Sequence, residues 1–215
     1  MDCSKEKDRN ISRDKFNKVK TFQGFIDLWS KFYTNEICIP TYLDNFVGAG
    51  DNPDATIEMG KKFQEIVSYG IIPHNFQTNS LEDTQKAYVD MYVPNELASV
   101  IAEYINRYPG YVSFWQDIKD EFTLGDLVVT YDPTEEERKN SVKKGVFFGD
   151  PFSRLGYAGQ DDFDFISEWL SKKAKKIINK DNFKQVTVID TIPTAKSDRI
   201  LDVILYALRD NKNRK

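Results

Sequence analysis

Residues 70–91 constrain the fold more than any other stretch, because they join the end of a helix to the start of two strands. Gly70 is a residue type that commonly follows a helix C-terminus. Ile71 and Ile72 then open a strand. Pro73 predicts that this strand lies at a sheet edge or contains a bulge, because proline has no backbone N–H to donate.

This first strand ends in polar side chains. Asn75 and Gln77 occupy positions where an apolar strand would continue, and His74, the only histidine of the chain, precedes them. A second strand is expected over residues 87–93. Polar groups at the end of a core strand need hydrogen-bond partners, which are either other protein groups or a bound ligand. The end of the first strand is therefore a candidate for a functional site.

The other segments show helical or strand patterns. Apolar side chains at helical spacing predict five helices, at about residues 22–33, 54–70, 95–108, 162–179 and 197–210. Further strands are expected at residues 111–114, 127–131, 145–148 and 186–190. The strands come partly in groups instead of alternating regularly with helices. This order favours the α+β class, with mixed sheets flanked by helices.

The expected domain organisation is simple. Residues 1–20 are rich in positively and negatively charged side chains and contain almost no apolar side chain before Phe16. This composition is typical of a flexible charged arm. Residues 21–210 are long enough for a single α+β domain, and residues 211–215 form a basic tail.

Composition limits the partners and the compartment. A net charge of −4 and a pI near 5.2 make nucleic acid an unlikely partner, and no apolar run is long enough to cross a membrane. The charged first ten residues do not resemble a secretory signal. Two cysteines, Cys3 and Cys38, fit a reducing compartment better than a disulfide framework, so we expect a cytoplasmic protein. One histidine and no clustered cysteines argue against a metal site.

The chain contains no established catalytic motif. GxGxxG, the P-loop, GxSxG and HExxH are all missing from the sequence, and a catalytic triad would have to use His74. We therefore expect no catalytic residues and no enzyme. Four lysines, Lys172, Lys173, Lys175 and Lys176, follow the helix pattern at 162–179. They could bind phosphate, although a helix C-terminus alone would favour cations there.

Several motifs in order resemble the C-terminal regulatory domain of eukaryotic methylenetetrahydrofolate reductase. They are Phe25-Ile26-Asp27-Leu28-Trp29, Gly70-Ile71-Ile72-Pro73-His74-Asn75-Phe76-Gln77, Gln85-Lys86-Ala87-Tyr88-Val89, Gly145-Val146-Phe147-Phe148-Gly149 with Asp150-Pro151, and the segment from Asp181 through Val188-Ile189-Asp190. The resemblance spans residues 22–208. A (β/α)₈ catalytic barrel needs at least about 200 residues by itself, so reductase activity is excluded on length.

That family senses S-adenosylmethionine, and the resemblance implies a stand-alone, non-catalytic ligand-binding protein. The implied ligand is S-adenosylmethionine, a related adenosine metabolite or another nucleotide, and no further cofactor is assigned. The residues that would line the pocket are Thr56, His74, Asn75, Phe76, Gln77, Gln85 and Lys143. Thr56 could equally be a first-turn helix residue, His74 a half-exposed strand residue, and Phe76 a core residue.

The sequence departs from the family at its pocket. Ala55 stands where the family has an acid, and Pro73 and Phe76 replace residues that bear hydroxyl groups. Lys143, near a third such position, has the wrong charge for a sulfonium. Lys143, His74 and Phe76 would instead suit a ligand with an anionic part and a flat ring. The alternative is a protein-interaction module that kept the fold and lost the ligand, with a protein partner or a homodimer, as in the resembled family.

Overall fold

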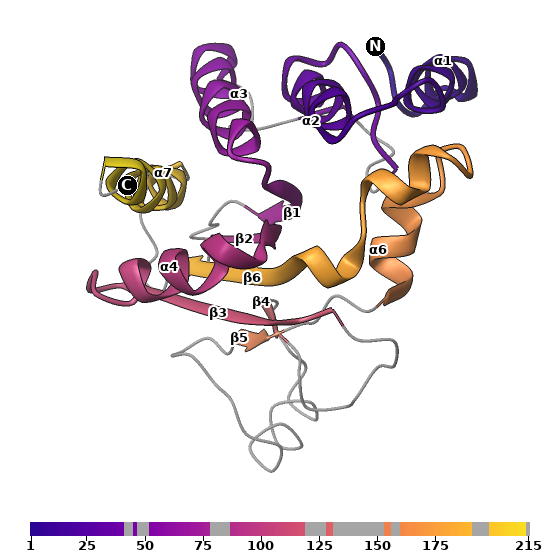
Figure 1. Cartoon of the computed structure of the whole chain (residues 1–215). Coiled ribbons are helices and arrows are strands. Elements are labelled where there is room, and N and C mark those ends of the chain that lie inside the picture. Colours follow the sequence, from indigo (N-terminus) through magenta and orange to yellow (C-terminus); the bar gives the residue numbers. More distant parts are fainter. Residues whose placement is uncertain are drawn as a thin grey trace, which may run out of the picture.

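The protein is an α+β chain in which helices gather on one side of an antiparallel sheet (Figure 1). The computed structural model describes residues 1–40, 45–46, 52–77, 87–118, 128–130, 153–155, 160–190 and 198–213. The α-helices are α1 (Glu6–Phe16), α2 (Phe22–Ser30), α3 (Pro53–Ser68), α4 (Asn95–Ile105), α6 (Gln160–Ser167) and α7 (Arg199–Asn213). Short 3₁₀ helices are η1 (Lys31–Thr34), η2 (Ala174–Ile177) and η3 (Lys180–Asn182). The strands are β1 (Ile72–Gln77), β2 (Tyr88–Pro94), β3 (Tyr111–Asp117), β4 (Val128–Thr130), β5 (Ser153–Leu155) and β6 (Phe183–Asp190).

The main sheet has four strands in the order β1-β2-β6-β3. We expected mixed sheets, but every strand pairing in the described part of the chain is antiparallel, including the separate β4–β5 pair. β6 comes from near the end of the sequence and lies between β2 and β3. The sheet is therefore completed only when the last strand has been inserted between earlier ones.

Both predictions for the first strand are confirmed. β1 is an edge strand, and its register with β2 shifts between Pro73 and Asn75. Pro73 lies opposite Met91 and Asn75 lies opposite Asp90, so His74 is the extra residue of a β-bulge. The bulge sets the direction of the His74 side chain relative to its neighbours in β1.

β3 lies at the other edge of the main sheet, and its backbone is hydrogen-bonded by a side chain. Asn106, just after α4, accepts a hydrogen bond from the Ser113 backbone N–H at 2.8 Å and donates one to the Ser113 carbonyl at 3.2 Å. The amide group thus takes the place of a neighbouring strand at that point, which reduces the tendency of the edge to pair with another chain.

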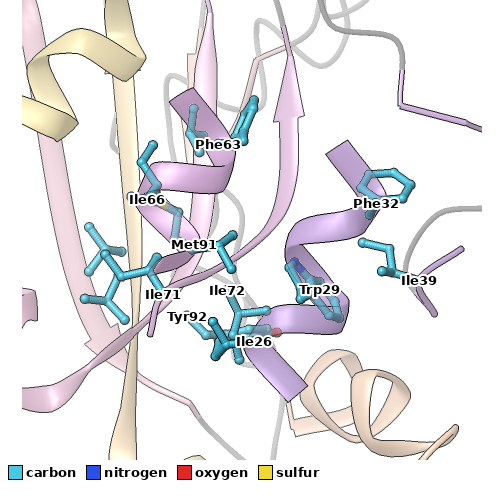
Figure 2. Packing of buried hydrophobic residues seen from close by; sticks show 14 of the residues in the cluster. Ile26, Trp29, Phe32, Ile39, Phe63, Ile66, Ile71, Ile72, Met91 and Tyr92 are labelled. Atoms are coloured by element: carbon cyan, nitrogen blue, oxygen red, sulfur yellow. The ribbon is translucent and has the colours of Figure 1, made fainter. Parts of the chain in front are cut away.

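One face of the main sheet is covered by helices, and we call it the helix-covered face. Side chains alternate between the two faces of a strand, and the register places Phe76 and Val188 opposite Val89. Phe76, Met91 and Val188 therefore share this face. Phe63 of α3 packs on Phe76 with ring centroids 4.9 Å apart. Figure 2 shows this core continuing to Trp29, Phe32 and Ile39.

Helix boundaries follow the capping signals of the sequence. The Thr21 side chain accepts a hydrogen bond from Gly24 N–H at the start of α2, as expected. Asn52 caps α3 in the same way, with Pro53 as the first helical residue. Gly70 follows α3 with φ of 79°, a left-handed conformation that favours glycine.

The expectation of a flexible arm over residues 1–20 is wrong for most of that segment, because Glu6–Phe16 form α1. Acidic residues in its first turn and basic residues in its last turn complement the helix dipole. Phe16 is buried and packs against Phe25 and Trp169, with ring centroids 5.8 and 6.1 Å away. A single buried aromatic side chain therefore anchors a helix whose composition is otherwise polar.

The two cysteines also differ from expectation. Cys3 and Cys38 form a disulfide with a Cα–Cα distance of 5.5 Å, and both residues are buried. The Cys38 backbone N–H donates to the Ser12 hydroxyl at 2.9 Å, and the Met1 ammonium group donates to the Asn35 carbonyl at 2.8 Å. The N-terminal segment is thus held to the domain by covalent and polar contacts that spacing alone did not reveal.

The helix expected over residues 162–179 ends much earlier, at Ser167. The Ser167 hydroxyl donates to the Asp164 carbonyl at 2.8 Å, a local contact that competes with continuation of the helix. The Ser171 hydroxyl then accepts from Ala174 N–H at 3.2 Å where η2 begins. The four lysines therefore do not lie in the last turn of an α-helix, and a helix dipole does not explain them.

Other predictions lie partly or wholly outside the described residues. The strand at residues 127–131 is found as β4, whereas the strand expected at 145–148 falls outside them. Within the described residues, no helix is long and apolar enough to cross a membrane.

Candidate functional site

The face of the sheet opposite the helix-covered face has a polar centre, and we call it the polar face. The register places Asn75 opposite Asp90, and Asp90 opposite Thr187, so all three side chains project from the same face. Tyr88 lies two residues from Asp90 on the same face. Three strands, β1, β2 and β6, therefore bring these polar groups together.

Asp90 is the charged centre of this cluster. It is 9% exposed, and its Oδ1 accepts a hydrogen bond from the Thr187 hydroxyl at 2.5 Å. The Asn75 amide donates a long contact to Asp90 Oδ2 at 3.5 Å, and the Tyr88 hydroxyl donates one to Asn75 Oδ1 at 3.5 Å. Burial, and then the charge of Asp90, raise the pKa of the Tyr88 phenol. Tyr88 therefore stays protonated and remains a hydrogen-bond donor.

His74 borders the cluster through the bulge. Its ring stacks on Tyr92 with centroids 4.2 Å apart and an interplanar angle of 16°. Burial lowers the pKa of His74 from 6.5 to about 3, so the imidazole is neutral at physiological pH. Its Nε2 atom is buried and has no hydrogen-bond partner among the described residues. A neutral imidazole is a poor general base, and it offers a hydrogen bond in place of a charge to a ligand.

The structure separates the other predicted site residues. Phe76 points to the helix-covered face and packs in the aromatic core, so the core interpretation of Phe76 is correct. Thr56 lies in the first turn of α3, where its hydroxyl donates to the Asn52 carbonyl at 3.0 Å. Gln77 belongs to β1, and its backbone pairs opposite Tyr88. Gln85 and Lys143 lie outside the described residues.

A cavity lies next to one end of the polar face, between α6 and the η2–η3 segment. Its volume is about 470 Å³, which is within the usual range for small-molecule sites. It is lined by Phe163, Asp164, Ser167, Lys175, Ile178, Asn179 and Lys180. The Phe163 ring contacts Tyr92 edge-on, with centroids 5.0 Å apart. Tyr92 thus touches both His74 and the aromatic wall of the cavity.

Sequence reasoning found His74 and Asn75 but missed Asp90 and Thr187. A signal for both was present, because each interrupts a run of apolar strand residues, Val89-Asp90-Met91 and Val186-Thr187-Val188. Polar side chains at such positions indicate either a solvent-facing side or a buried polar cluster. Only the pairing of strands 97 residues apart shows that the two side chains meet.

Comparison with known proteins adds no identification. No protein-family model matches this sequence, and no curated protein matches it. The function is therefore argued from the site.

Proposed function

We propose that this protein is a non-catalytic, small-molecule-binding protein whose ligand is an adenosine metabolite or another nucleotide. The polar face of the main sheet would hold the ligand's ring system, close to Asp90, Asn75 and His74. The observation that supports this most is the buried Asp90 cluster beside an enclosed imidazole whose Nε2 atom has no described partner. Replacing a buried charged group by apolar residues is often neutral or stabilising, so a buried carboxylate is weak evidence for a purely structural role.

The chemistry of the cluster suits a base with both donors and acceptors. Asp90 accepts hydrogen bonds, the Asn75 amide can do both, and a neutral imidazole offers one of each. The Tyr92 ring, stacked on His74, supplies a flat apolar surface. S-Adenosylmethionine, related metabolites and nucleotides all contain an adenine or similar ring, so the polar face alone does not choose among them.

The test is a thermal-shift series with adenosine, S-adenosylmethionine, AMP and ATP at millimolar concentration. A ligand at a hundred times its dissociation constant stabilises the folded state by about 2.7 kcal/mol, which corresponds to a shift of roughly 5–10 °C. Asp90→Asn keeps the size of the side chain and removes its charge, so we expect the shift to shrink. Asp14→Asn, on an exposed part of α1, is the matched control. No shift with any compound would reject the proposal.

A second candidate function is a protein-interaction module, as a homodimer or with another protein. One observation favours it: Trp115 is 47% exposed on β3, an edge strand of the main sheet. Phe76, whose bulk suggested a filled pocket, instead points to the helix-covered face and leaves the polar face unaffected. Measuring mass in solution by light scattering separates the two, because a dimer lost in Trp115→Ser would support the interaction function.

The disulfide bears on the compartment. Cytoplasmic thiols are kept reduced, whereas Cys3 and Cys38 are bonded to each other. The cytoplasmic location expected from composition therefore loses the support of the cysteines, and the disulfide favours an oxidising compartment. Titrating free thiols in unfolded, unreduced protein tests this, since an oxidised chain gives none and a reduced chain gives two.

A further inference from the structure

We propose that the cavity between α6 and the η2–η3 segment binds the phosphate groups of the ligand. The ligand would then be a nucleotide and not S-adenosylmethionine or an uncharged nucleoside. This inference rests on the proposed ligand-binding function and names its ligand class. It is carried by the lining of the cavity, by the distribution of lysines around it, and by its contact with the polar face.

The lining of the cavity combines cationic, polar and aromatic groups. Lys175 and Lys180 contribute two ammonium groups against one carboxylate, that of Asp164. The Asn179 amide and the Ser167 hydroxyl add hydrogen-bonding groups. Ammonium and amide N–H groups are typical phosphate ligands, and a volume of about 470 Å³ exceeds what a phosphate needs. The cavity therefore has room for a phosphate chain together with part of a sugar.

Positive charge is concentrated in this part of an acidic protein. Residues 171–180 contain five lysines and no acidic residue, whereas the whole chain has a net charge of −4. Lys172, Lys173, Lys175 and Lys176 are exposed, and none forms an ion pair with a carboxylate in the part of the chain that the structure describes. A concentration of cations on one side of a cavity raises the local concentration of anionic ligands.

Two lysines elsewhere in the described residues are paired with carboxylates of other elements. The Lys62 ammonium lies 2.7 Å from Asp198 and 2.8 Å from Asp202, and Lys184 is paired with Asp117. Those lysines stabilise contacts between elements of the fold. Lys172, Lys173, Lys175 and Lys176 form no such ion pair among the described residues, and because α6 already ends at Ser167, they do not serve the end of that helix.

One wall of the cavity is in contact with a side chain of the proposed ring site. Phe163 forms part of its lining and contacts both Tyr92 and Phe183, which project from the polar face. Tyr92 in turn stacks on His74. A nucleotide could therefore place its base against the Asp90 cluster and its phosphates near Lys175. S-Adenosylmethionine has a sulfonium at the corresponding end, which the lysines would repel.

The experiment is isothermal titration of the full chain with adenosine, AMP, ADP, ATP, S-adenosylmethionine and pyrophosphate, at low and at physiological salt. We expect affinity to increase from adenosine to ATP, by about tenfold for each well-placed phosphate contact. Lys175→Glu should lower ATP affinity by at least about tenfold and leave adenosine affinity unchanged. Lys31→Glu, on the distant η1, makes the same charge change as a control and should alter neither.

The outcomes separate this inference from the proposed function. Equal affinities for adenosine and ATP, or ATP affinity unaffected by Lys175→Glu, would overturn the phosphate site while the ligand-binding function stands. Binding of pyrophosphate that depends on Lys175, without binding of any nucleoside or nucleotide, would keep the anion site and reject the adenosine ligand. If no compound binds, both proposals fail.

Discussion

The two faces of the main sheet use the same strands for different purposes. On the helix-covered face, Met91 and Val188 are fully buried and belong to the hydrophobic core cluster. On the polar face, the adjacent residues Asp90 and Thr187 are also buried but are bonded to each other. Figure 1 shows α1, α2, α3 and α7 on one side of the sheet and the β4–β5 pair on the other.

The difference shows where stability and function are located. Burial of apolar side chains against helices provides most of the free energy of folding. A buried carboxylate adds little net stability, because the cost of removing it from water offsets its hydrogen bonds. Apolar packing on the helix-covered face therefore contributes more to stability than the hydrogen-bonded cluster of the polar face.

The largest expected effect is on the helix-covered face, at Phe63. Its ring stacks on Tyr33 with centroids 4.6 Å apart, contacts Phe76, and is fully buried. Phe63→Ala should lower the free energy of unfolding by about 3–5 kcal/mol, because it leaves a cavity that rigid aromatic neighbours cannot fill. Urea denaturation measures this. A loss below about 1 kcal/mol would mean that the helices do not depend on this contact.

The disulfide should have the next largest effect. It joins Cys3, which precedes α1, to Cys38, which follows η1, with a sequence separation of 35. Replacing both cysteines by serine should lower the free energy of unfolding by about 3–4 kcal/mol, mainly through the entropy of the unfolded chain. A reducing agent should lower the free energy of unfolding of the natural chain but not that of the variant with two serines. If reduction also abolished ligand binding, the separation of the two faces would be incorrect.

His74, the bulge residue, should make the free energy of unfolding depend on pH, an effect of intermediate size. Burial lowers the pKa of His74 to about 3 in the folded protein, below its value of 6.5 in the unfolded chain. The unfolded state then binds more protons between these values, so stability is complete above pH 6.5 and falls as the pH decreases toward 3. Between pH 7 and pH 5 the loss should be about 2 kcal/mol.

Because His74 is the only histidine, this dependence can be assigned to one group. His74→Gln should remove the pH dependence between pH 7 and pH 5 while keeping a polar side chain in the bulge. The measurement is urea denaturation of both proteins at several pH values. An equal pH dependence in the variant would show that the imidazole is not enclosed as described.

The sequence predicted the fold well where the signals are local. Gly70 correctly marked the end of the helix that is α3, and Pro73, which predicted an edge strand or a bulge, lies in a strand that has both. The prediction for the N-terminal segment was wrong, because the segment is held by distant contacts. These are one disulfide and the packing of Phe16 on Trp169. Composition alone does not report contacts between residues more than 150 positions apart.

The candidate site could be predicted only in part for the same reason. His74 and Asn75 were found because they interrupt the pattern of their own strand. Their main partner, Asp90, belongs to the next strand, and Thr187 comes from β6, whose place between β2 and β3 is a property of the topology. The cavity near Lys175 depends on the end of α6 at Ser167. The helical spacing of apolar residues had predicted that this helix continues to residue 179.

The smallest effects are expected from changing the polarity of two adjacent residues of β6, one on each face of the sheet. Thr187→Val removes the donor to Asp90 and should lower the free energy of unfolding by about 1–2 kcal/mol, with weaker ligand binding. Val188→Thr places a hydroxyl in the apolar core and should cost a similar 1–3 kcal/mol without changing affinity in the folded protein. The two side chains have nearly the same shape, so the comparison isolates polarity. If Val188→Thr were neutral in stability, or if both variants weakened binding equally, the two faces would not differ in function.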